Sequence, residues 1–198
     1  EAHSIEDLSK NKLTIITYNY DRVLEESILS MLKNTERYQE IENIDFLPIL
    51  HVNGAFEFSN EYPNSKHLSD WHSNKKWYEN SEWENMILEN SERIFMINEG
   101  VSEEVKGWRK QAKKSILNAE KIYSIGFACA PENTSLIGLE DGVNESMWPA
   151  DFYALNYDGN INLQKRFNEL GAEDSPINGS TDRPMGCSKA AELGFFLQ

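Results

Sequence analysis

Residues 12–33 read KLTIITYNYDRVLEESILSMLK, and this segment carries the clearest structural pattern of the chain. The β-branched run at residues 12–17 predicts a strand that is buried on both faces. The apolar positions within residues 22–33 recur at helical spacing, which predicts a helix with one face in the core. Asp21 is the expected N-cap of that helix, because its carboxylate can accept a hydrogen bond from an unpaired backbone N–H.

The same alternation of strand and helix continues along the rest of the chain. Alternation of this kind implies a parallel sheet that helices cover on both faces, and right-handed crossovers then favour a doubly wound arrangement. The predicted fold class is α/β, a Rossmann-like doubly wound parallel sheet of about five strands. The further strands are predicted at 46–52, 93–98, 121–127 and 152–155, and the further helices at about 103–119, from 131, at 161–170 and at about 188–196.

Residues 57–90 break this alternation. Trp71, Trp77 and Trp83 stand there among many Asn, Ser and Glu residues, without a clean helical or strand period. Irregular segments of this length are uncommon inside a compact domain and often cover a site. We therefore expect an aromatic-rich insertion or lid, with a weak helix near 80–90.

The charge of the chain excludes several classes of partner. Acidic residues outnumber basic ones by 33 to 19, which gives the 198-residue chain a net charge of −14. Such a surface repels phosphate backbones and anionic bilayers, so DNA, RNA and membranes are not expected partners. Cys129 and Cys187 show no disulfide or metal-binding spacing, which fits a reducing cytoplasm and predicts no metal site. His67 and His72 lie in a polar stretch and do not have the spacing of helical metal ligands.

Polar residues follow four of the five predicted strands. The ligand crevice of a doubly wound sheet lies at the carboxyl ends of its strands, so these residues are the candidate site. Short amides suit ribose hydroxyls, since an amide both donates and accepts hydrogen bonds, and Gly126 would let a ligand approach the backbone closely. The four segments are 17–21, 51–54, 126–133 and 156–160.

The order of these segments resembles that of sirtuin-like NAD-binding domains. Thr-Tyr-Asn-Tyr-Asp at 17–21, a His-containing strand that ends at Gly54, Ile-Gly-Phe at 125–127 before Pro-Glu-Asn, and a strand that ends at Asn156 follow one another as in that family. The segment AEKIYSIGF at 119–127 is especially similar to a divergent bacterial branch, which includes NAD-degrading anti-phage defence effectors. The resemblance covers about residues 12–170.

The resemblance implies a role for each candidate residue. Asn19 would bond the nicotinamide ribose and position the attacking water, with Asp21 as the acidic residue beside it and His51 as the base. Gly126 would contact the ribose and phosphate side of NAD, and Asn156 the adenosine ribose. The remaining cofactor-binding candidates are Thr17, Gly54, Phe127 and Asn133.

The implied activity is cleavage of the bond between nicotinamide and ribose, that is, an NAD glycohydrolase. This reaction passes through an oxocarbenium-like state, which nearby carboxylates and amide dipoles stabilise, while a histidine can take a proton from water. NAD is therefore the expected substrate or ligand, and no metal is expected.

Departures from the family pattern keep two alternatives open. Asn53 stands where sirtuins have a histidine before the glycine, and no Gly-rich phosphate turn precedes Asn19. We expect residues 1–198 to be a single sirtuin-like domain that lacks its N-terminal Gly-rich segment, because the chain starts at Glu1 without a methionine. The first alternative is a catalytically inactive module for nucleotide sensing or protein assembly, as a homo-oligomer or with further domains. The second is an acidic interaction domain without a ligand.

Overall fold

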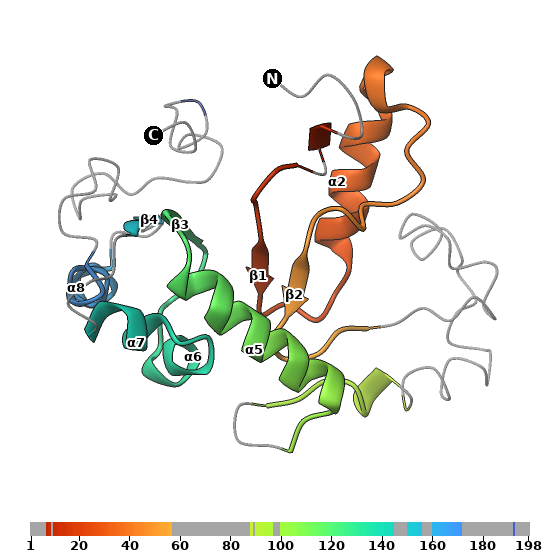
Figure 1. The fold of residues 1–198 in the computed structure, drawn as a ribbon. Coiled ribbons are helices and arrows are strands. Elements are labelled where there is room, and N and C mark those ends of the chain that lie inside the picture. Colours follow the sequence, from red (N-terminus) through yellow and green to blue (C-terminus); the bar gives the residue numbers. More distant parts are fainter. Residues whose placement is uncertain are drawn as a thin grey trace. The chain divides into compact units, whose positions relative to one another are not determined.

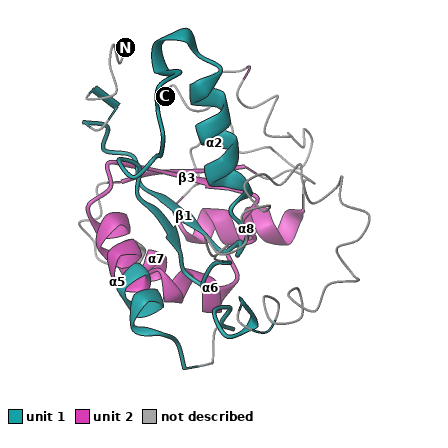
Figure 2. Cartoon of the chain, turned by 90° about the vertical axis from the view of Figure 1, so that its right-hand side faces the viewer, with its two compact units in different colours: residues 1–108 teal, residues 109–198 magenta. Residues whose placement is uncertain are grey.

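The computed structural model describes residues 7–8, 10–56, 88, 90–96, 100–144, 150–155, 160–171 and 192. The chain divides into two compact units, residues 1–108 and residues 109–198, which Figure 2 shows in different colours. Each unit combines helices with a pair of parallel strands, so the chain is a mixed α/β protein. No helix in these described ranges has the length and apolar character needed to cross a bilayer.

The first unit is built on a strand, a helix and a second, parallel strand. β1 (Ile15–Thr17) leads into α2 (Val23–Lys33) and the short 3-10 helix η1 (Glu36–Tyr38), and β2 (Ile49–His51) then returns beside β1. Figure 1 shows the two strands side by side, with α2 next to them. The register sets Ile15 opposite Ile49 and Thr17 opposite His51, and the two strands are parallel, as predicted for the strands of this chain.

Both strands are shorter than the apolar runs that predicted them. Two further backbone hydrogen bonds extend the pairing beyond the strands, from Ile15 N to Pro48 O at 2.9 Å and from Val52 N to Thr17 O at 3.1 Å. The chain turns at Val52 and Asn53, directly after β2. The carboxyl ends of β1 and β2 therefore lie together at one edge of the sheet.

The start of α2 differs by one residue from the prediction. Arg22 is the N-cap residue and its side chain makes no capping hydrogen bond. The carboxylate of Asp21 accepts a hydrogen bond from Val23 N at 3.1 Å. Asp21 thus satisfies the first backbone donor of the helix, although it stands one position before the N-cap. A difference of one residue is usual for the boundary of a helix.

Helix α5 (Glu103–Leu117) begins in the first unit and ends in the second. Ser102 caps it as predicted, because its hydroxyl oxygen accepts a hydrogen bond from Val105 N at 3.3 Å. Val105, Ala112 and Ile116 form the buried stripe that their helical spacing predicts. The lysines of the opposite face are exposed, as expected for a solvated face.

The second unit contains β3 (Lys121–Ile125) and β4 (Asp151–Leu155), which pair in parallel along their whole length. α6 (Pro131–Leu136) and α7 (Leu139–Asn144) lie between them in sequence, and α8 (Ile161–Glu169) follows. On one face of the sheet Phe152 packs against Phe167 of α8, with ring centroids 6.5 Å apart. The predicted strands and helices of this region are therefore confirmed in kind, with shifts of one or two residues at their ends.

The predicted α/β class with parallel strands is confirmed, whereas a doubly wound sheet of about five strands stays a prediction. The described residues contain two parallel sheets of two strands each, β1–β2 and β3–β4. The third predicted strand is wrong for residues 93–96, which form a turn and coil; Phe95 N donates a hydrogen bond to Asn53 O, in the loop after β2, at 2.8 Å. Residues 97–98 lie outside the described ranges, as does most of the predicted insertion at 57–90 and of the helix at 188–196; Leu88, Asn90 and Glu192 are helical.

Arg166 of α8 joins several segments of the second unit. Its Nε donates to the carbonyl of Cys129 at 3.1 Å and its Nη2 donates to Thr134 Oγ1 at 3.2 Å. The same guanidinium pairs with Glu140 of α7. The hydroxyl of Thr134 also donates to Glu140, and this bond, together with the hydrogen bond and charge of Arg166, outweighs burial and lowers the pKa of the Glu140 carboxyl.

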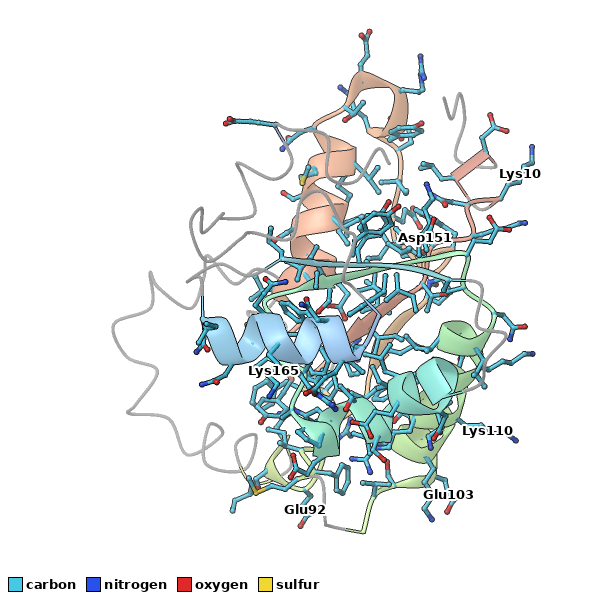
Figure 3. The ribbon with its side chains drawn as sticks, turned by 90° about the vertical axis from the view of Figure 1, so that its left-hand side faces the viewer. Lys10, Glu92, Glu103, Lys110, Asp151 and Lys165 are labelled. Carbon is cyan, nitrogen blue, oxygen red and sulfur yellow. The ribbon has the colours of Figure 1, made fainter. Side chains whose placement is uncertain are left out.

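We expect Arg166→Ala to lower the free energy of unfolding by about 1–3 kcal/mol, since it leaves a carbonyl, a hydroxyl and a carboxylate without their shared donor. Lys165 is the matched control, because it is the preceding residue of the same helix and is exposed, as Figure 3 shows. Lys165→Ala should change the same quantity by less than about 0.5 kcal/mol. Urea denaturation of both variants measures the difference, and equal values would contradict a stabilising role for Arg166.

Candidate functional site

The loop after β1 is held by its own side chains and by the loop after β2. Thr17 Oγ1 accepts a hydrogen bond from Asn19 N at 3.1 Å, which folds the chain back as it leaves the strand. The backbone of Tyr20 then accepts a hydrogen bond from Phe56 N at 2.8 Å. Asn19 itself is exposed, so its side-chain amide is open to a ligand at this edge.

His51 is the last residue of β2 and its side chain is completely buried. Its Nδ1 lies 2.8 Å from the backbone oxygen of Asn19, and its Nε2 lies 2.8 Å from Glu25 Oε1. The ring also lies beside that of Trp108 in α5, with ring centroids 6.0 Å apart. Both nitrogens of His51 are therefore occupied by protein acceptors.

Glu25 connects this histidine to the start of α2. Its Oε1 also accepts a hydrogen bond from Arg22 Nη1 at 2.8 Å, and Arg22 Nε donates to the backbone oxygen of Phe56 at 3.3 Å. Burial raises the pKa of the Glu25 carboxyl, but the hydrogen bonds from His51 and Arg22 outweigh it and hold that pKa at about 2. Glu25 is thus a half-buried, ionised carboxylate at neutral pH.

Together these contacts tie the ends of both strands to one helix. We name Arg22, Glu25 and His51 the strand-end cluster. Sequence reasoning singled out His51 but missed the other two members and Trp108. The spacing of Arg22 and Glu25, three residues apart at a helix start, is a readable ion-pair signal. The contact of Glu25 with His51, 26 residues later, has no such local signal.

Gly54 has a structural reason to be glycine. Its φ is +89°, and a Cβ at this position would lie 1.8 Å from the carbonyl oxygen of Arg93. The atoms that lie close to Gly54 are therefore those of the protein's own backbone. A role for Gly54 in holding a cofactor stays a prediction.

A pocket of about 340 Å³ opens beside Gly54. This volume is at the lower end of the range of small-molecule sites. Trp108 belongs to its wall and also contacts His51, so the pocket adjoins the strand-end cluster. The lining residues mix aromatic, acidic and basic side chains: Gly54, Ala55, Glu92, Arg93, Phe95, Ser102, Glu104, Val105 and Trp108.

The other candidates belong to the second unit. Gly126 has a φ of +63° and is exposed, with open space where a side chain would stand. Phe127 is partly exposed, and Asn133 lies in the first turn of α6, where its backbone N–H donates to Ala130 O at 2.9 Å. Asn156 lies outside the described residues.

Cys129, between these residues, is buried and adopts a positive φ of 51°. Burial raises the pKa of its thiol to about 11, and neither the hydrogen bond with Ser124 nor the charge of Arg166 offsets it. A thiol of this kind stays protonated at neutral pH and is a poor nucleophile. This agrees with the prediction of a small buried side chain in the core.

The structure brings Thr17, Asn19 and His51 together within the first unit, while Asp21 is used at the start of α2. Gly126, Phe127 and Asn133 belong to the second unit, and their convergence with these residues stays a prediction. Within the described ranges, no three His, Cys, Asp or Glu side chains gather as metal ligands.

Comparisons of the chain with protein-family models, with curated proteins and with solved structures gave no match. The sirtuin-like resemblance therefore stays a prediction that is based on the order of the motifs in the sequence.

Proposed function

We propose that this protein binds a dinucleotide of the NAD class at the carboxyl edge of β1 and β2. The observation that carries the proposal is the parallel register of Thr17 with His51, which sets the loop of Asn19 against the end of β2. Ligands of α/β proteins with parallel sheets bind at this edge. The proposal extends the sirtuin-like reading of the sequence.

The chemistry of the edge suits the ribose part of such a ligand. The exposed amide of Asn19 can donate to one hydroxyl and accept from another. The backbone around it is fixed before a ligand arrives, because Thr17, His51 and Phe56 all hydrogen-bond to residues of its loop. A prearranged loop loses less conformational entropy on binding, which favours affinity.

The contacts of His51 favour binding of NAD without its cleavage. A general base needs a nitrogen lone pair within reach of the proton that it removes. Both nitrogens of His51 face acceptors of the protein itself, and the ring is buried. Asn53, the next polar residue, has no basic group. We therefore propose a nucleotide-sensing module, with NAD glycohydrolase activity as the second candidate, in which a ligand would first have to displace these contacts.

Isothermal titration calorimetry with NAD, on the full chain and on Asn19→Ala, tests the binding proposal. The variant should weaken binding about tenfold, the equivalent of about 1.4 kcal/mol, because it removes hydrogen bonds to ribose. Asn34→Ala is the matched control, since Asn34 is an exposed amide at the opposite end of α2. This control should leave the affinity for NAD unchanged.

A parallel assay of fluorescent NAD-analogue cleavage separates the two forms of the function. Binding without cleavage supports the sensing module, whereas cleavage that Asn19→Ala abolishes supports the glycohydrolase. Absence of any heat of binding up to millimolar NAD would contradict both, and would leave the acidic interaction domain.

A further inference from the structure

The surroundings of His51 restrict its protonation. A backbone carbonyl, here that of Asn19, can only accept a hydrogen bond. An ionised carboxylate, here that of Glu25, can also only accept. Both lie 2.8 Å from a ring nitrogen, a normal hydrogen-bond length for an N–H donor. Both nitrogens can make these bonds only if both carry a proton.

We infer that His51 is held as a buried, doubly protonated imidazolium by Glu25, and that its charge positions the loop carrying Asn19. The pair thus acts as a pH-sensitive latch between β2, α2 and the loop after β1. Its consequence for a ligand rests on the proposed function, whereas the latch itself does not. Glu25 is in this sense a positioning residue, since it acts on Asn19 through His51.

Loss of one proton from the His51 ring would break one of its two hydrogen bonds, either to the Asn19 carbonyl or to Glu25. A neutral imidazole keeps one N–H, so its other nitrogen would turn a lone pair toward an acceptor oxygen at 2.8 Å. That contact is repulsive, and burial of the ring in surroundings of low dielectric strengthens the repulsion. Either Asn19 or Glu25 would then move away, and the loop after β1 would lose its tie to β2.

The charged groups around the ring are consistent with this arrangement. Glu25 on α2 bonds the ring directly, and Arg22, directly before the first residue of α2, bonds the same carboxylate oxygen. The carbonyl of Asn19 and the indole of Trp108 on α5 also contact the ring, and neither of these two groups carries a charge. The remaining oxygen of Glu25, Oε2, is buried without a hydrogen-bond partner among the described residues. The hydrogen bonds of the Glu25 carboxylate therefore go to Arg22 and His51.

Nitrogen-15 NMR of the histidine rings tests the inference directly. The chain has four histidines, and single replacements of His3, His67 and His72 by Gln identify the signals that belong to His51. We expect both ring nitrogens of His51 to carry protons at pH 6–7, and Glu25→Gln to lose the second proton at a lower pH than the native protein. Glu26→Gln is the matched control, as an exposed acidic neighbour on the same helix, and should titrate like the native protein.

The NMR signal of the Tyr20 backbone amide shows whether the protonation of His51 affects the loop that carries Asn19. Its peptide N–H belongs to the same peptide group as the Asn19 carbonyl, so it should shift at the pH at which His51 loses a proton. NAD affinity should fall over the same pH range in the native protein and at lower pH in Glu25→Gln.

A neutral ring with one protonated nitrogen at pH 6 would overturn the inference, and so would an identical ring titration in Glu25→Gln and Glu26→Gln. The ring and amide signals need no ligand, so failure of NAD to bind would count against the proposed function alone.

Discussion

Glu25→Ala is expected to lower the free energy of unfolding at pH 7 by about 3 kcal/mol, because it leaves a buried partner without its counter-charge. The Glu25 side chain is 16% exposed and the side chain of His51 is fully buried, so water cannot replace the lost carboxylate at the ring. Arg22 would lose the same partner. Glu26→Ala, at the next and exposed position of α2, should change stability by less than about 0.5 kcal/mol. Chemical denaturation of both variants measures the contrast.

The pH dependence of this effect has a defined sign. The folded-state pKa of Glu25 is about 2, below its ordinary value of 4.5, so folding favours the ionised carboxylate. The stabilisation is therefore complete above pH 4.5 and is lost as the pH falls from 4.5 toward 2. The difference in stability between the native protein and Glu25→Ala should shrink over that range. A difference that stays constant between pH 6 and pH 3 would contradict an ionised, paired Glu25.

Gly54→Ala is expected to lower the free energy of unfolding by about 2–5 kcal/mol, which combines the strain of a positive φ with overpacking. The φ of Gly54 is +89°, and the added Cβ would stand 1.8 Å from the carbonyl oxygen of Arg93 and 2.9 Å from its carbon. Both of these atoms are backbone, so the clash cannot be relieved by a side-chain rotation. The loop after β2 or the segment of Arg93 would have to move.

Gly107 provides the matched control for this substitution. It lies within α5, and a Cβ there would meet nothing within 4 Å. Gly107→Ala should stabilise the protein by up to about 1 kcal/mol, because alanine loses less conformational entropy than glycine in a helix. Thermal and urea denaturation of the two variants give the comparison. A Gly54→Ala protein as stable as the native chain would show that the tight contact with Arg93 does not exist in solution.

The strand-end cluster was predicted only in part from the sequence. The motif at 17–21 and the polar end of the second strand pointed to the carboxyl edge of the sheet, and the register of Thr17 with His51 confirms that these two segments meet. Their roles toward NAD stay predictions, and the contacts that the structure describes for them are made within the protein. Asp21 serves the start of α2, and His51 bonds the protein itself.

Glu25 was missed for a physical reason. The helix has two adjacent glutamates, Glu25 and Glu26, and from the sequence each of them can be explained as a solvated residue. Its partner His51 lies 26 positions later, and the bond between them forms only because β2 returns parallel to β1. Glu25 can be told apart from Glu26 only when the strand stands beside the helix.

Local periodicity and capping chemistry were readable from the chain itself. They specify the helix that follows Asp21, the cap at Ser102 and the strand segments of both units, although not the pairing of those strands, because these features depend on residues only a few positions apart. Contacts between distant residues required the folded chain. The ionised state of Glu25 depends on His51, which is 26 residues away in the sequence. The steric clash that requires glycine at position 54 depends on the backbone of Arg93, which is 39 residues away. Burial sets the strength of those contacts, and burial is a property of the packed structure and not of the local sequence.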